Sequence, residues 1–299
     1  MIAPRWMAGC LLLTALAAGT ISDVPRRHAP LVIHGYHVLA ADFHVHSFPL
    51  SWATLAPWDT VIDARWQGLD VIAITGHNHV WVAKIGRWFS RLMGGPTVLV
   101  GEEIVSPRYH LLALGIDRSI RWRQTAARAI DAVHRQGGIA IAAHPLAQFW
   151  PAYDAEAMGK LDGAEVLHPI AYSSGNLAAE LREFYGRSRL TAIGDSDYHG
   201  LGPMGLCRTY VFTPDETEHG ILDALRHRRT IVYDRGRTYG DPALIRLAAG
   251  SGALAHLAQA APAPGFLSIY SRIAGVLGLI GAVVLGCDAL AGRSRHRAE

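Results

Sequence analysis

Short apolar runs alternate with stretches of helical spacing along the middle of the chain. The runs near residues 69–75, 97–100, 139–143, 164–167, 190–194 and 208–213 predict strands. Most of these runs lack an alternation of apolar and polar positions, which is typical of strands covered on both faces. The intervening residues 57–67, 80–93, 124–136, 175–187 and 217–227 predict helices, several of which stop at a glycine. Repeated strand-then-helix units predict either a parallel barrel or a doubly wound sheet.

Potential metal ligands stand at the ends of these strands. His44 and His46 end the apolar run that begins near Leu31, and the alternation of a strand puts both side chains on one face. Neutral imidazole is a good ligand for zinc, iron or manganese. Other candidates border the later strands: His77, His79, Glu102, Glu103, His110, His144, His168, Asp195, Asp197 and His199. Because active-site groups of barrels gather at the carboxyl ends of their strands, this pattern predicts a metal centre and favours the barrel.

Composition narrows the class of protein further. The 299 residues are 50% hydrophobic and 18% charged, enough for the core of one large α/β domain. A net charge of +3 without a long Lys/Arg run carries no strong nucleic-acid signal. Three cysteines, two of them in apolar segments, do not make a disulfide framework, and Cys207 is expected to be a small buried side chain.

Apolar segments flank this central region, which we place at residues 31–245. Residues 1–22 carry Arg5 and then an uncharged run, the layout of a secretory signal peptide or of an N-terminal anchor. Residues 246–265 predict a linker rich in Ala, Gly and Pro. The apolar segment 266–290 predicts a transmembrane helix, since its core would span about 33 Å; a buried helix of the domain is the alternative. With arginines after this helix, the catalytic domain is expected to be membrane-anchored and extracytoplasmic.

In their order along the chain, the strand-end segments resemble the motifs of the PHP (polymerase and histidinol phosphatase) superfamily over about residues 31–240. The matching segments are Asp42-Phe43-His44-Val45-His46-Ser47, Ile74-Thr75-Gly76-His77-Asn78, Gly101-Glu102-Glu103-Ile104, His110-Leu111-Leu112-Ala113-Leu114, Ala143-His144-Pro145 and Ser196-Asp197-Tyr198-His199. Each is weakly specific alone, whereas the ordered set is highly specific. The resemblance implies a distorted (β/α)7 TIM-like barrel with two or three metal ions, and most characterised members hydrolyse phosphoesters.

The resemblance also implies which residues hold the metals. It implies three metal positions. His44, His46, Glu103 and Asp197 would hold the first metal, Glu103, His110 and His144 the second, and His77 and His199 the third. Glu103 would thus bridge two divalent ions (Zn, Mn or Fe), which lower the pKa of a bridging water and polarise phosphoryl oxygens. Asp197 and His199 are the predicted catalytic residues, one receiving a proton from the water and the other protonating the leaving group.

Two departures from the family pattern bear on the third metal. Thr75-Gly76-His77 replaces the usual Thr-Asp-His, and residues 48–54 carry no strong ligand where relatives have Asp or His. We therefore expect two firmly held ions and a weaker third. His168 and Arg208 are further candidates for contacting substrate.

The resulting hypothesis is a metal-dependent phosphoesterase that uses a metal-bridging hydroxide on a small phosphorylated substrate. One alternative is a catalytically degenerate barrel that binds metal or a phosphorylated ligand. Another is an amidohydrolase-like enzyme that cleaves C–N or C–O bonds, because similar metal barrels support that chemistry. The sequence does not identify the substrate or the oligomeric state.

Overall fold

The chain divides into two compact units in the computed structural model, which describes residues 2–22, 31–200, 202–251 and 266–295. The larger unit covers His28–Ala261, and the smaller one combines Met1–Arg27 with Pro262–Glu299. All the candidate site residues belong to the larger unit. The expected linker at 246–265 falls mostly on residues outside the described ranges.

One sheet forms the frame of the larger unit. Among the described residues its order is β11-β10-β9-β2-β3-β4-β5-β6-β7-β8, with β1 (Leu31–Ile33) paired to β2. The sheet contains two blocks of parallel strands. The first block is β2 (Tyr36–Val45), β3 (Val71–His77) and β4 (Thr97–Ser106), and the second is β6 (Ile139–Ala142), β7 (Gly163–Leu167) and β8 (Thr191–Gly194). Strand β5 (Tyr109–Leu114) joins the two blocks and runs antiparallel to both of its neighbours. On the other side of β2, the strands β9 (Thr209–Thr213), β10 (Thr230–Asp234) and β11 (Arg237–Gly240) follow in antiparallel order.

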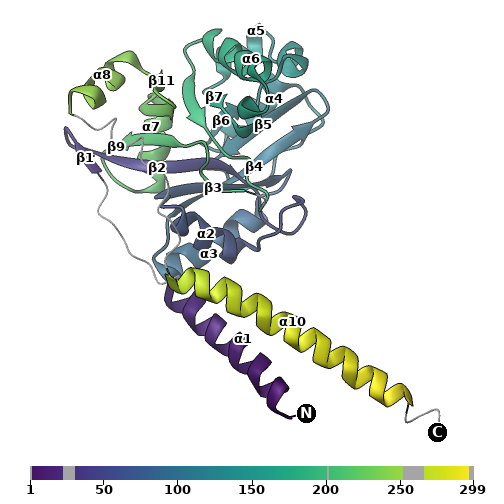
Figure 1. Ribbon diagram of the computed structural model, residues 1–299. Coiled ribbons are helices and arrows are strands. Elements are labelled where there is room, and N and C mark those ends of the chain that lie inside the picture. The colour runs from purple at the N-terminus through teal and green to yellow at the C-terminus, as the bar shows by residue number, and fades with distance from the viewer. Residues whose placement is uncertain (1, 23–30, 201, 252–265, 296–299) are drawn as a thin grey trace. The chain divides into compact units, whose positions relative to one another are not determined.

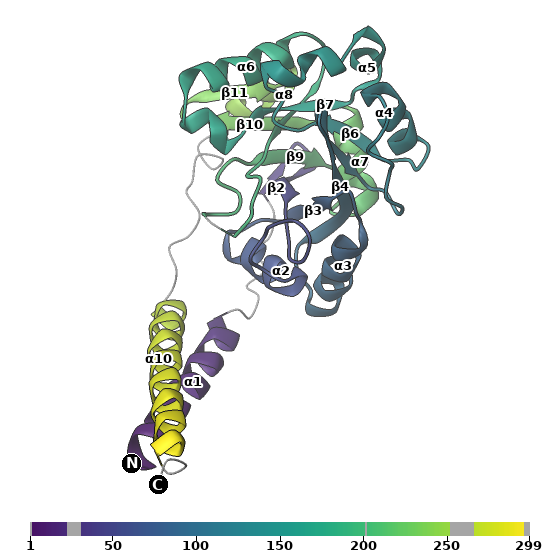
Figure 2. The same ribbon diagram turned by 90° about the vertical axis from the view of Figure 1, so that its right-hand side faces the viewer.

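The sheet is strongly curled (Figures 1 and 2), and β8 at one end of it lies beside β9 and β10. Threonine side chains, and not a backbone ladder, connect β8 to these two strands. The Thr209 hydroxyl accepts from Gly194 N at 2.9 Å, and the Thr230 hydroxyl donates to Ala192 O at 2.8 Å. The architecture is therefore an α/β, nearly closed barrel, as predicted, but antiparallel pairs interrupt the strict strand-then-helix repeat.

Side-chain alternation divides the apolar residues into an inner and an outer core. Leu39, Phe43, Leu99, Leu112 and Ile141 point into the barrel and are fully or almost fully buried. The inner core also includes Ile221, Ala224 and Leu225 of α7 (Glu218–Arg226), which begins close to Thr97, the first residue of β4. Because α7 packs at this amino end of the strands, the carboxyl ends remain for the site.

Helices cover the outer faces of the strands and agree with the predicted spans. They are α2 (Pro57–Trp66), α3 (Trp81–Met93), α4 (Ala126–His134) and α6 (Gly175–Gly186); α7, at the amino end of the barrel, also agrees with its predicted span. Sequence patterns did not predict η1 (Ala147–Ala152), α5 (Ala155–Lys160), η2 (Pro169–Tyr172) or α8 (Pro242–Gly250), all of which are short. The starts of α4, α5 and α7 are capped by Thr125, Asp154 and Thr217, whose side chains accept first-turn N–H groups.

The smaller unit is a pair of helices, α1 (Ile2–Ser22) and α10 (Phe266–Arg295). Small residues let the two backbones approach, since a Cβ added to Gly278 would lie 2.8 Å from the Leu12 side chain. Tyr270 and Ser271 add hydrogen bonds of 2.9 and 2.8 Å to Thr14 Oγ1 and Ala15 O.

The prediction of a membrane anchor is wrong. In the portions of the chain that the structure describes, no helix combines the length and the hydropathy that a bilayer crossing needs. Glycines of α10 serve its close approach to α1. The predicted transmembrane helix at 266–290 and the membrane-anchored, extracytoplasmic placement that depended on it are therefore withdrawn.

Candidate metal centre

The first two histidines lie at the carboxyl end of β2, where a bulge interrupts the ladder. The pairing of β2 with β3 shifts register between Asp42 and Val45, so that Val45 packs in the outer core although Phe43 packs in the inner one. His44 and His46 are both fully buried, and their ring centroids are 4.9 Å apart. The bulge thus directs both imidazoles into the same end of the barrel.

Glu103 lies at the centre of the histidines and divides them into two groups. Its Oε1 lies 2.7 Å from Nδ1 of His110 and 3.2 Å from Nε2 of His144. Its Oε2 lies 3.2 to 3.5 Å from Nε2 of three other rings, those of His44, His46 and His77. A carboxylate placed in this way could contact two cations, one through each oxygen.

His110 reaches this cluster because β5 runs antiparallel to its neighbours. It is the second residue of β5, and the amino end of an antiparallel strand lies at the same edge as the carboxyl ends of β4 and β6. Phe149 of η1 lies against its ring, with centroids 5.0 Å apart. The Tyr153 hydroxyl also hydrogen-bonds the His110 backbone oxygen, which fixes the start of the strand.

Asp197 and His199 enter the cluster from the segment after β8. The Oδ1 atom of Asp197 lies 3.0 Å from His46 Nε2 and 3.3 Å from His44 Nε2, whereas its Oδ2 lies 3.4 Å from His168 Nε2. The ring of His199 stacks on His46 at a centroid distance of 4.2 Å. Asp197 has a φ of 47° and His144 a φ of 26°, values that non-glycine residues rarely adopt and that recur at functional sites.

Two buried aspartates hold this segment against β2. The Asp42 carboxylate accepts hydrogen bonds from Ser196 N at 3.1 Å and Gly205 N at 2.8 Å, and also from the Ser196 hydroxyl. Asp195 in return accepts from Phe43 N at 2.7 Å. Burial raises the pKa of both aspartates, and for Asp195 the nearby Asp42 adds to the rise. Asp195 therefore positions Asp197 through the backbone instead of joining the ligands.

Glu165 of β7 is a site residue that the sequence reasoning missed. Its Oε1 lies 2.7 Å from His44 Nδ1, and its Oε2 accepts from His144 N at 2.6 Å. A charged residue in the apolar run 163–167 was the available signal, because an unpaired carboxylate is rarely buried completely. Glu165 orients His44 so that its Nε2 points at Glu103 and Asp197, as carboxylates commonly do for ligand histidines.

The charges of the site favour a cation at its centre. Burial would raise the pKa of Glu103, but the charge of His44 and the hydrogen bonds with His110 and His144 hold it well below its usual range. Burial would likewise lower the pKa of His44, yet the charges of Asp197, Glu165 and Glu103 keep it well above its usual value. Burial lowers the pKa of His46 to about 4, so this ring is neutral near pH 7 and suited to bind a metal.

The residues present fit divalent metal ions. Four clusters of possible ligand atoms, each within 4.8 Å, occur among the described residues: His44, His46 and Asp197; His44, Glu103 and His144; His46, His77 and His199; and His44, Glu165 and His168. The buried Nε2 atoms of His44, His46 and His168 lie 3.0 to 3.4 Å from oxygens of Asp197 but form no well-aligned hydrogen bond with a described residue. Unsatisfied buried nitrogens are costly, and coordination would satisfy them.

Some candidates lie elsewhere. Glu102 points to the opposite side of β4 from Glu103 and accepts from Ile120 N at 2.6 Å. His79 belongs to none of the four clusters of the described residues; its ring lies against Gly76 and stacks on Trp81. The guanidinium of Arg208 donates hydrogen bonds to the backbone oxygens of Gly205 and Gln67, both at 2.7 Å. These bonds connect two segments of the chain, so Arg208 has a structural role.

Comparison with known proteins supports the fold. The family described as PHP-associated matches residues 179–230, from α6 to the start of β10. An uncharacterized protein of Methanocaldococcus jannaschii is 28% identical over 147 residues, which are 44% of this chain and 82% of that protein.

Among solved structures, a two-domain protein from Bacteroides vulgatus, described as containing a predicted PHP-like metal-dependent phosphoesterase, superposes with a TM-score of 0.59. It is 23% identical, and the match covers 74% of this chain and 73% of that one. A lesion-specific endonuclease from Pyrococcus furiosus matches with a TM-score of 0.41 at 13% identity, over 68% of this chain and 57% of the other. That second likeness is too weak to carry a conclusion. The chain thus carries a PHP-associated segment on a fold shared with a PHP-like protein, which confirms its resemblance to the PHP superfamily.

Proposed function

We propose that this protein is a metal-dependent hydrolase of phosphoesters. The observation that carries the proposal is the division of the histidines by the two oxygens of Glu103, with His110 and His144 on one side and His44 and His46 on the other. Two cations held on either side of one carboxylate are the basis of many phosphoester hydrolases.

The ligands follow from the clusters. His44, His46 and Asp197 would hold one ion, His110 and His144 a second, and Glu103 would contact both. When bound, such ions supply an activated water and stabilise the charge that develops on the phosphoryl and leaving oxygens. The cluster of His46, His77 and His199 offers a third position, but His46 already serves the first ion, so only His77 and His199 remain for it and we expect weaker binding there. Zinc, manganese and iron all suit this donor set.

The residues of the chain move the protons. Asp197 directs Oδ1 toward the metal ligands and Oδ2 toward His168, so Oδ2 is the atom that would receive the proton of the attacking water. His168 would then hold that proton next to the carboxylate. His199 has its Nδ1 at 2.8 Å from the backbone oxygen of Asp197, which leaves Nε2 to protonate the leaving-group oxygen.

The cluster is buried on one side and open to solvent on the other. His44, His46, Glu103 and Glu165 are almost completely inaccessible, whereas His77, His199, Asp197 and His110 keep 25%, 29%, 26% and 22% of their side-chain surface exposed. Substrate would therefore approach from the side of these four residues.

The test is metal analysis of the purified full-length protein followed by an assay on phosphomonoesters and phosphodiesters. We expect two firmly bound ions per chain, a weaker third, and turnover that a chelator abolishes and a divalent ion restores. Three stoichiometric ions after dialysis would contradict the expected weakness of the third position.

A catalytically degenerate barrel is the second candidate, because the third cluster lacks a carboxylate. It predicts bound metal without turnover of any phosphoester. Hydrolysis of amides or lactones in place of phosphoesters would support an amidohydrolase-like enzyme instead. The assay therefore includes amides and lactones beside the phosphoesters, and its outcome then selects one of the three functions.

A further inference from the structure

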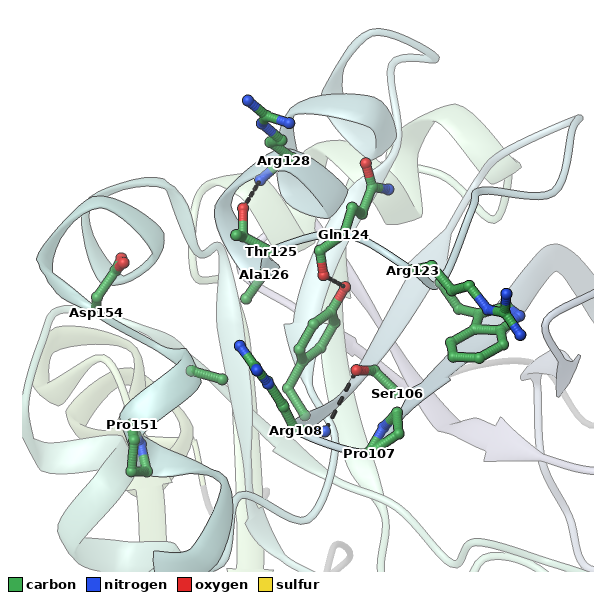
Figure 3. Close-up of a pocket in the computed structure, with 13 residues that line it drawn as sticks. Ser106, Pro107, Arg108, Arg123, Gln124, Thr125, Ala126, Arg128, Pro151 and Asp154 are labelled. Atoms are coloured by element: carbon green, nitrogen blue, oxygen red, sulfur yellow. Dashed lines mark hydrogen bonds between the residues drawn. The ribbon is translucent and has the colours of Figure 1, made fainter.

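A cavity lies apart from the histidine cluster, beside the turn that joins β4 to β5. It measures about 500 Å³, within the range of small-molecule sites. Its walls are the turn residues 106–109, residues of the segment 122–128 at the start of α4, and Pro151, Ala152 and Asp154 at and just after the end of η1 (Figure 3). None of the proposed metal ligands lines it.

The lining is strongly basic. Arg108, Arg123 and Arg128 contribute three permanent positive charges, and Asp154 is the single carboxylate, which leaves a net charge of about +2. The Asp154 carboxylate accepts from Ala157 N at 2.9 Å as the cap of α5. No ion pair among the described residues includes any of the three arginines, although arginines elsewhere in the chain pair with Glu218, Glu183 and Asp223.

The three arginines reach the cavity from different segments of the chain. The Arg108 side chain points into the space between the start of α4 and Pro151 (Figure 3). The guanidinium of Arg123 lies 4.6 Å from the centroid of the Trp122 ring, a cation–π contact that limits its rotamers. Arg128 is in the first turn of α4, where the helix dipole adds positive potential and the Thr125 side chain accepts from its backbone N–H at 3.4 Å.

Arg108, Arg123 and Arg128 are all exposed to solvent beside the cavity and have no ion-pair partner among the described residues, so their guanidinium groups remain available to an anion. Guanidinium binds phosphate oxygens with two parallel hydrogen bonds, and this geometry makes arginine the usual side chain for phosphate recognition. The cavity is larger than one phosphate ion requires, which leaves room for an organic group.

We propose that this cavity is a second ligand site, which binds a phosphorylated small molecule with at least two negative charges. The proposal does not depend on the metal centre or on the proposed function.

The cavity shares two walls with a metal ligand. Residues 106–109 run directly into His110, and η1, which ends at the cavity, places Phe149 on the His110 ring. The Tyr109 side chain packs in the outer core and its hydroxyl donates to Gln124 O at 3.2 Å, so the two sites lie on opposite sides of β5. A ligand in the cavity would order the segments that position His110.

The test is a calorimetric titration of inorganic pyrophosphate into the full-length protein after removal of metal with a chelator and desalting. Removing the metal eliminates coordination of the probe at the histidine cluster. We expect one saturable site, with affinity reduced at least about tenfold by Arg108→Ala and by Arg128→Ala, because each removes charged hydrogen bonds.

Arg135→Ala is the matched control, since Arg135 is an exposed arginine at the other end of α4 and does not line the cavity. It should leave the affinity within about twofold of the parent. Thermal unfolding of each variant checks that the fold is retained, and Arg108→Lys, which keeps the charge but not the two parallel hydrogen bonds, should bind with intermediate affinity. Absence of saturable binding to the metal-free protein would overturn the proposal, as would equal losses in Arg108→Ala and Arg135→Ala.

Discussion

Replacing Glu103 by glutamine tests the bridging carboxylate directly. The carboxylate lies 2.7 to 3.5 Å from nitrogens of five histidines and is almost fully buried. Glutamine keeps the size and one oxygen but removes the negative charge that both cations would share. Removing one partner of a buried ionic cluster costs about 3–5 kcal/mol, so the affinity for each of the two ions should fall by about two to three and a half orders of magnitude, at about 1.4 kcal/mol per tenfold.

The assay is elemental analysis after gel filtration, combined with competition against a chromophoric chelator to obtain the affinities. Glu102→Gln is the matched control, because Glu102 is the adjacent residue on the opposite face of the same strand. Its Oε1 accepts from Ile120 N at 2.6 Å, and the glutamine oxygen can replace it. This variant should retain both ions.

Two results would refute the reasoning. If Glu103→Gln binds both ions as tightly as the parent, the carboxylate does not bridge them. If Glu102→Gln loses the ions while Glu103→Gln retains them, the register that we assign to this part of β4 does not hold in the metal-bound protein.

Three further predictions follow from the same contacts. Asp197→Asn should lose one ion and all turnover, whereas His199→Ala should keep two ions and lower kcat; unchanged kcat in His199→Ala would exclude it as the proton donor. Glu165→Gln should weaken the ion held by His44 about tenfold, since it removes the charge that orients Nδ1, and an unchanged metal affinity would contradict this positioning role. Burial raises the pKa of Glu102 to about 7 from 4.5, so the folded protein keeps a proton that the unfolded chain releases, and stability falls as pH rises across this interval. The free energy of unfolding of Glu102→Gln, measured with denaturant, should therefore rise by up to about 3 kcal/mol relative to the parent as pH increases from about 4 to about 8. A difference between variant and parent that does not change with pH would contradict the raised pKa of Glu102.

Much of the barrel was predictable because its determinants are local. Apolar runs of strand length, helical spacing and glycine stops act over a few residues, so the spans of α2, α3 and α4 follow from the sequence. The strand-end positions of His44, Glu103 and His144 were visible for the same reason. Their convergence follows from the rule that parallel strands bring their carboxyl ends to one edge.

The membrane prediction failed where composition alone had to decide. Glycines in an apolar helix suit a lipid-facing helix pair and a close-packed helix pair equally. In the structure they allow α10 to approach α1, a contact between segments more than two hundred residues apart in sequence. Local hydropathy does not report which apolar surface meets another part of the same chain.

Only the tertiary structure decided how the ligands divide around Glu103 and what supports them. Glu165, Asp42 and Asp195 act through hydrogen bonds to groups at least 21 residues away, and no local pattern marks such partners. The antiparallel run of β5, which brings His110 to the correct edge, likewise depends on pairing with β4 and β6. Residue types and their order along the chain follow from sequence, whereas the choice of partner requires the closed barrel, because burial and distance exist only after the strands have paired.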